Sequence, residues 1–185
     1  MPPPLISVVI ATVGRETLER AVESARWADE VIVVYDSAQL PERVPDGANA
    51  YAHGPTRHWG AEQRHFGISR STGTHIAFMD DDDVYTSIAA DAIRNALRAR
   101  PGRVHIFRMR DAEREYGGDG CVVQGSIGSP MFVVPNDGRL GEWSFRYEGD
   151  YDFIRSTLDR RGDRPRFHEP VIALVRPGEP PRRWH

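Results

Sequence analysis

Short apolar runs alternate with helical patterns through the first half of the chain, and this alternation constrains the fold more than any other feature. The runs are rich in Val, Ile, Ala and Phe, as buried strands are. Strands that alternate with helices indicate βαβ units and a largely parallel sheet. We therefore predict an α/β fold with a single Rossmann-like mixed sheet flanked by helices. The expected strands are 5–11, 31–35, 48–52 and 75–79, and the expected helices are 16–26, 56–69 and 87–100.

The second half of the chain has a different pattern, in which strand-like runs are separated by glycine-rich turns. This pattern predicts mixed or antiparallel pairing. A chain of 185 residues is long enough for one well-cored domain and short for two. We therefore predict one domain over residues 1–185, with a mobile tail at 177–185. The expected elements of this half are strands at 104–109, 121–124, 131–134 and 167–175 and a helix at 150–161.

The charge balance and the cysteine content exclude several classes of protein. The chain has 24 Lys and Arg against 27 Asp and Glu, so it has no global basic field that would attract nucleic acid. The single cysteine, Cys121, excludes an internal disulfide framework and fits a reducing compartment. The N-terminus lacks the basic region of a signal peptide, and its apolar run is too short to span a bilayer. We predict a cytoplasmic protein with no membrane span.

Four consecutive aspartates, residues 80–83, directly follow the expected strand at 75–79. Such a cluster repels itself unless a cation shares it, and carboxylate oxygens are the ligands that Mg²⁺ and Mn²⁺ prefer. The carboxyl end of a strand in an open α/β sheet is also where ligands bind. We therefore predict a Mg²⁺ or Mn²⁺ site here. On the charge pattern alone, a solvated acidic turn remains an alternative.

Three segments together resemble one family. The strand at 6–12, the strand at 31–34 that ends near Asp36, and the run at 76–83 resemble the N-terminal half of glycosyltransferase family 2. The resemblance implies a GT-A fold, a nucleotide-sugar-binding half at about 1–100 and an acceptor-side half at about 101–176. It also implies an inverting transfer from a nucleotide diphosphate sugar, most often a UDP-sugar, to a hydroxyl. The acceptor class and the oligomeric state stay open.

The resemblance also assigns residues to the nucleotide. In the family, the first strand and its loop cradle the nucleotide, and the acid after the second strand binds the base. The helix before the aspartates carries an Arg-Asn pair and a glycine, but His65 stands here in place of the Asn. The matching residues of this chain are Ala11, Thr12, Arg15, Asp36, Gly60, Arg64 and Gly67.

Within the aspartate run, the resemblance places Asp80 at the ribose or a metal-bound water and Asp82 on the metal. Asp81 is expected to point away from the metal, because alternate residues of an extended segment face opposite sides. We still include Asp81 with Asp80 among the residues of the nucleotide-sugar site. His168 is a candidate for a further metal ligand, as is His185.

An acceptor hydroxyl needs a general base, because its proton is held too tightly to leave at neutral pH. By the resemblance, Asp150 is the first candidate and Glu148 the second, at the start of the helix expected at 150–161. An Asp at this position is alternatively a helix cap. The aromatics Trp143, Phe145 and Tyr147 alternate, which would place them on one face to stack on a sugar ring, although core packing explains them equally well.

Two other functions are compatible with parts of the sequence. A nucleotidyltransferase can use a similar sheet and metal, but it should carry a glycine- and lysine-rich phosphate loop, and residues 12–15 contain no lysine. A non-catalytic nucleotide-sugar-binding subunit would explain the short second half. The presence of both the aspartate run and the acids at 148–152 argues against it.

Overall fold

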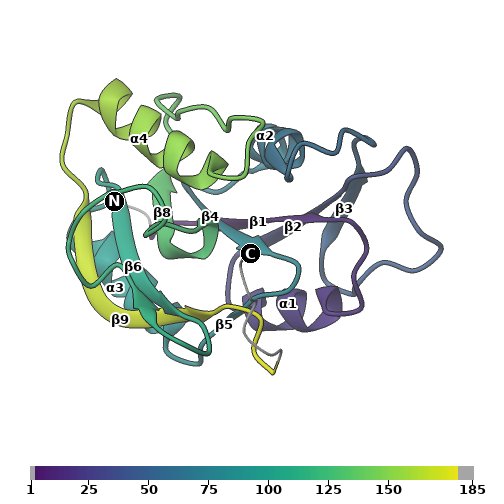
Figure 1. Ribbon diagram of the computed structural model, residues 1–185, viewed down its shortest axis with the longest axis horizontal. Helices are drawn as coiled ribbons and strands as arrows, with labels where there is room; N and C mark the ends of the chain where they lie inside the picture. The colour runs from purple at the N-terminus through teal and green to yellow at the C-terminus, as the bar shows by residue number, and fades with distance from the viewer. Residues whose placement is uncertain (1–2, 179–185) are drawn as a thin grey trace.

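The computed structural model describes residues 3–178, which form one mixed sheet with helices on both faces (Figure 1). The sheet has the order β3-β2-β1-β4-β8-β6-β9-β5, and β7 pairs with β6. The strands are β1 (Ile6–Thr12), β2 (Glu30–Tyr35), β3 (Asn49–Ala52), β4 (His75–Asp80), β5 (Val84–Tyr85), β6 (His105–Arg110), β7 (Glu115–Tyr116), β8 (Phe132–Pro135) and β9 (Arg166–Leu174). The helices are α1 (Leu18–Ala25), α2 (Ala61–Arg70), α3 (Ala89–Ala99) and α4 (Gly149–Arg161), with a 3-10 turn η1 at Ser129–Met131.

The first half of the chain forms the parallel part of the sheet. β1 lies between β2 and β4, and all three strands run in the same direction. The chain first adds β2 and β3 on one side of β1 and then crosses to add β4 on the other side. The strand order therefore reverses between β1 and β4, and the carboxyl ends of strands at such a switch point form a ligand crevice. Ala11 lies directly opposite Asp80 there.

Two hydrophobic cores cover the two faces of the sheet. Side chains of β1 alternate between them, so Ile10 packs with α1 and α3 while Val9 packs with the core that contains Ala61 and Phe153. Figure 1 shows the same division, with α2 and α4 on one face and α1 and α3 on the other. Every residue of β1 is buried, which explains its continuous apolar sequence.

The second half of the chain continues the same sheet with mixed pairing, as predicted. β8 pairs antiparallel with β4, and β6 pairs antiparallel with β8. β9 is parallel to β6 and antiparallel to β5. Because β8 runs antiparallel to β4, the η1 turn that precedes β8 lies beside the aspartates at the end of β4. No helix in residues 3–178 is long and apolar enough to cross a membrane.

Two expected elements differ from the structure. Helix α2 begins at Ala61 and not at residue 56, because Arg57, Trp59 and Gly60 have left-handed backbones with φ of 57°, 53° and 77°. The strand expected at 121–124 is absent, and β7 pairs with β6 in its place. Left-handed glycines on both sides of 121–124 prevent an extended pairing there. Most of the tail expected at 177–185 lies outside the described residues.

The contact between α2 and β1 gives a stability prediction. Gly67 lies on the buried face of α2, where an added Cβ would collide with Val9 Cγ1 of β1. Gly67→Ala is therefore expected to destabilise the protein by about 1–3 kcal/mol, because a β-branched side chain cannot yield easily. The intrinsic helix propensity of Ala would predict the opposite sign.

Urea unfolding of Gly67→Ala measures this effect. Gly102→Ala is the matched control, because a Cβ at that position meets no atom within 4 Å. The control is expected to remain within about 0.5 kcal/mol of the wild type. A Gly67→Ala variant as stable as the control would contradict the close packing of α2 on β1.

Candidate functional site

A cavity of about 930 Å³ lies at the carboxyl ends of β1 and β4. It is lined by residues from both halves of the chain, including the loop before α2 and the start of α4. Almost all the site residues expected from the sequence line this one cavity. They are Ala11, Thr12, Arg15, Asp36, Gly60, Arg64, Asp80, Asp81, Asp82, Glu148 and Asp150.

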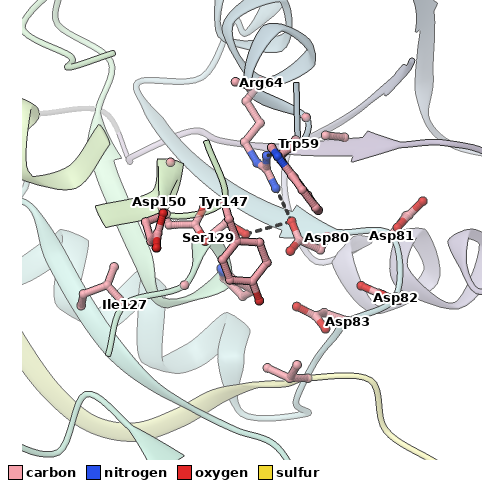
Figure 2. A pocket seen from close by; sticks show the side chains of 18 of the residues that line it. Trp59, Arg64, Asp80, Asp81, Asp82, Asp83, Ile127, Ser129, Tyr147 and Asp150 are labelled. Carbon is pink, nitrogen blue, oxygen red and sulfur yellow. Dashed lines mark hydrogen bonds and ion pairs between the residues drawn. The ribbon is translucent and has the colours of Figure 1, made fainter. Parts of the chain in front are cut away.

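Three carboxylates converge at the end of β4. Asp80, Asp82 and Asp83 each offer one oxygen, and these oxygens lie within 4.8 Å of one another. Figure 2 shows the three side chains turned toward the same open space. Burial, together with the neighbouring carboxylates, raises the pKa of Asp82 and raises that of Asp83 well above its usual range. Hard oxygen donors whose ionised forms repel one another fit Mg²⁺ or Mn²⁺.

Asp81 faces the opposite side from these three carboxylates (Figure 2). Its carboxylate accepts hydrogen bonds from Thr12 Oγ1 at 2.6 Å and from the Val13 backbone N–H at 3.3 Å, and it pairs with Arg15. The side chain is buried. Asp81 therefore fixes the loop that follows β1, and through this loop it shapes that side of the cavity.

Arg64 of α2 connects the two halves of the site. Its buried guanidinium pairs with Asp80 and donates a hydrogen bond to the Trp59 carbonyl at 2.9 Å. Ser129 Oγ donates to the same Asp80 oxygen at 2.9 Å. Burial alone would lower the pKa of Arg64, but Asp80 and Asp150 raise it above its usual value. Arg64 is thus a fixed positive charge between the two acidic elements.

Asp36, after β2, is held by donors from the loop before α2. Its Oδ1 accepts hydrogen bonds from the Thr56 N–H at 2.6 Å, Gln63 Nε2 at 2.9 Å and Thr56 Oγ1 at 3.3 Å. Its Oδ2 accepts the Arg57 N–H at 3.0 Å and no other hydrogen bond from residues 3–178. A carboxylate oxygen has two acceptor positions, so Oδ2 retains one. Asp36 therefore supports the loop and still has an acceptor position for a ligand.

Asp150 is not a helix cap. Helix α4 begins at Gly149, and its cap residue, Glu148, makes no side-chain capping bond. Asp150 lines the cavity, and burial raises its pKa to about 7, with Arg64 opposing this rise and Asp80 adding to it. Glu148 differs, because it accepts a hydrogen bond from Gln124 Nε2 at 3.1 Å on a more exposed surface. The two acids thus have unlike environments.

His168 does not join the acidic cluster. It lies on β9, where its Nε2 is 2.9 Å from Nδ1 of His105 and its ring stacks on Phe107. The metal-ligand prediction for His168 is therefore wrong, and Asp83 supplies the third carboxylate of the cluster. His185 lies outside the described residues. Sequence spacing could have suggested Asp83, which belongs to the same run of aspartates.

Other sequence interpretations also change. Trp143, Phe145 and Tyr147 do not share a face, because residues 143–147 do not form a strand. Trp143 is buried, with its ring centroid 5.1 Å from that of Phe78, whereas the other two aromatics are exposed. His65, in place of the family's Asn, accepts a hydrogen bond from the Trp143 backbone N–H at 3.0 Å. It therefore positions the segment before α4.

Solved structures support the fold. The chain is similar to the crystal structure of S. aureus TarS, with a TM-score of 0.67 and 12% identity over 92% of this chain and 36% of that chain. It is also similar to TarS 1–349 in complex with UDP, with a TM-score of 0.65, 13% identity and 60% of that chain covered. The complex of TarS 1–349 with UDP-GlcNAc gives a TM-score of 0.66, 14% identity and 58% coverage. This chain therefore spans about a third of the first of these TarS chains and under two thirds of the other two.

Sequence comparisons define the family. No curated protein sequence matched the chain significantly. The sequence model of glycosyl transferase family 2 matches residues 7–111, which is more than half of the chain. These residues contain β1, β2 and the aspartates after β4, the segments that carried the resemblance. The expected GT-A fold agrees with the solved structures, and the chain belongs to glycosyltransferase family 2.

Proposed function

We propose that this protein transfers a sugar from a nucleotide diphosphate sugar, with UDP as the nucleotide, to an acceptor hydroxyl with inversion. One observation carries the proposal. A single cavity holds both a cluster of three carboxylates and a separate, half-buried Asp150 whose pKa is raised to about 7. The carboxylate cluster could bind a divalent cation together with the diphosphate, and Asp150 could remove the proton from an acceptor hydroxyl.

The donor nucleotide is assigned to the side of the cavity formed by β1 and β2. Asp36 Oδ2 has an unused acceptor position and would receive a base N–H, as the imide of uracil offers. The loop after β1, fixed by Asp81, lies beside it. The binding of UDP and UDP-GlcNAc by the similar TarS supports this choice of nucleotide.

The diphosphate is assigned to the carboxylate cluster. Asp80, Asp82 and Asp83 would hold a divalent cation, which when bound neutralises the charge that develops on the departing nucleoside diphosphate. Arg64 orients Asp80 by its ion pair, and Ser129 orients the same carboxylate by a hydrogen bond. These contacts fix Asp80 before the donor binds, so this carboxylate needs little reorganisation.

Asp150 is assigned as the general base. It takes the proton from the acceptor hydroxyl as the hydroxyl oxygen attacks the anomeric carbon. The new carbon–oxygen bond forms as the bond to the diphosphate oxygen breaks on the opposite face, which inverts the configuration. A pKa of about 7 suits this role, because the carboxylate is then both available and basic near neutral pH.

The carboxylate cluster predicts metal-linked nucleotide binding. Asp82→Asn is expected to remove most of the gain in UDP affinity that Mn²⁺ provides, because it removes one of three converging oxygens. Calorimetric titration of UDP with Mn²⁺ and with a chelator measures this gain. Asp81→Asn is the control from the same run: loss of its contacts to Thr12 and Arg15 should weaken UDP equally with and without Mn²⁺, so the gain from Mn²⁺ should match that of the wild type. Equal UDP affinity in Mn²⁺ and in chelator for the wild type would show that no cation is involved.

The environment of Asp150 predicts a pH profile. Because the base must be ionised, kcat/KM is expected to fall as the pH drops below about 7, the pKa of Asp150. Asp150→Asn should lower kcat by about 10²–10⁴-fold and abolish this acid limb. Its melting temperature should change little, because Asn removes a carboxylate whose ionised form the site disfavours, while Asp80 still pairs with Arg64. Glu148→Gln should retain the limb, and a fully active Asp150→Asn enzyme would exclude the base assignment.

The contacts of Asp36 predict selectivity for the base. Asp36→Asn is expected to weaken UDP by about tenfold, the value of one hydrogen bond to a charged group, because an amide nitrogen cannot accept the base N–H. Pyrophosphate, which lacks a base, should bind as before. Calorimetry in Mn²⁺ compares the two ligands for the wild type and the variant. Losses of equal size for UDP and pyrophosphate would place Asp36 outside the base subsite.

A further inference from the structure

Two large aromatic side chains are exposed where they line the cavity. Trp59, from the loop before α2, is 65% exposed, and Tyr147, from the segment before α4, is 57% exposed. Their rings contact each other edge to face, with centroids 5.5 Å apart and an interplanar angle of 86°. Exposed aromatic surface in a cavity is unfavourable in water and marks a ligand contact.

The backbone around Trp59 is strained. Among residues 3–178, the non-glycine residues with left-handed backbones are Arg57, Trp59 and Arg176, and all three line the cavity. Such conformations cost about 1–3 kcal/mol each and persist only where the surroundings impose them. The hydrogen bond from Arg64 to the Trp59 carbonyl is one such restraint. The fold therefore holds the indole at the cavity at an energetic cost.

The aromatic pair lies between the groups assigned to the donor and to the base. Arg64 donates a hydrogen bond to the Trp59 carbonyl and pairs with Asp80, so Trp59 lies next to the carboxylates assigned to the diphosphate. Tyr147 lies just before helix α4, close in sequence to Asp150. Both side chains line the same cavity (Figure 2). A ring resting on this pair would therefore have its edge near the general base.

We propose that Trp59 and Tyr147 form the acceptor subsite and select acceptors that present a flat ring face, either a sugar ring or an aromatic ring. This inference rests on the proposed function and adds the acceptor class to it. Two rings in edge-to-face contact offer a rigid surface of apolar area, which a flat ring covers and a flexible chain does not. The hydroxyl of the bound ring would then face Asp150.

The chain offers a matched control for this subsite. Phe145 is 58% exposed and lies two residues from Tyr147, but it is not among the residues that line the cavity. Its ring stacks on His58 with centroids 4.5 Å apart. Phe145→Leu removes an equally exposed aromatic from the same segment and leaves the proposed platform in place.

Saturation-transfer difference NMR tests the proposal with three probes. Each protein is saturated with UDP and Mg²⁺ and mixed with methyl β-D-glucopyranoside, benzyl alcohol or 1,6-hexanediol. The first two probes distinguish a sugar ring from an aromatic ring, and the diol has a hydroxyl but no ring. The wild type and Phe145→Leu are expected to saturate one or both ring probes and to ignore the diol.

The variants of the aromatic pair should behave differently. Trp59→Leu and Tyr147→Leu are expected to weaken ring-probe binding by about tenfold, and Trp59→Phe should retain part of it. Equal saturation in Trp59→Leu and the wild type would overturn the proposal, as would no saturation of either ring probe by the wild type. UDP binding by calorimetry is measured on the same variants. Loss of UDP affinity in Trp59→Leu would assign the indole to the donor and also overturn the proposal.

The two hypotheses fail separately. A wild-type protein that binds neither UDP nor UDP-sugars contradicts the proposed transfer, even if ring probes bind at Trp59. A protein that binds UDP normally but binds the diol as well as the ring probes retains the transfer and loses the aromatic subsite.

Discussion

The ion pair between Arg64 and Asp80 holds the site together. Arg64 is buried, so its charge would be costly without partners, and removing one partner of such a pair leaves the other uncompensated. Asp80 and Asp150 interact with the guanidinium from the two halves of the chain. The ring centroid of Trp143 lies 4.7 Å from the guanidinium carbon. The parallel sheet and the segment before α4 therefore meet at one cation. This arrangement brings the carboxylate cluster and Asp150 into a single cavity.

Much of the fold could be predicted from the sequence, because the signals were local. The alternation of apolar runs and helical patterns located β1, β2, β3 and β4 to within a residue or two, and the apolar character of β1 reflects burial on both faces. The start of α2 was misplaced, since left-handed backbones at Arg57 and Trp59 delay the helix and neither residue type signals that conformation. The strand expected at 121–124 failed for a related reason. Its apolar residues suggested extension, and the flanking glycines instead turn the chain.

Residues of the cavity that belong to a sequence motif could be predicted. Contacts that depend on the order of strands in the sheet could not. The aspartates after β4 and Asp150 were predicted from motif and position, and the structure places them in one cavity. His168 was misassigned, because its partner His105 lies on a neighbouring strand that only the sheet order reveals. The exposure of Trp59 had no sequence signal, because an aromatic beside a helix start usually packs inward. Its position depends on contacts across the fold.

In the proposed function, the cavity breaks the bond between a sugar and a nucleoside diphosphate by attack at the anomeric carbon. Time-resolved ¹H NMR of UDP-GlcNAc incubated with the protein and Mg²⁺ tests this claim most directly, with water as the acceptor. Asp150 and the carboxylate cluster predict release of UDP together with the β-anomer of GlcNAc as the first sugar product. Release of UMP would indicate attack at phosphorus, and early α-anomer would indicate retention. Either result would contradict inverting transfer at the anomeric carbon, as would no release of UDP from UDP-GlcNAc or any other UDP-sugar.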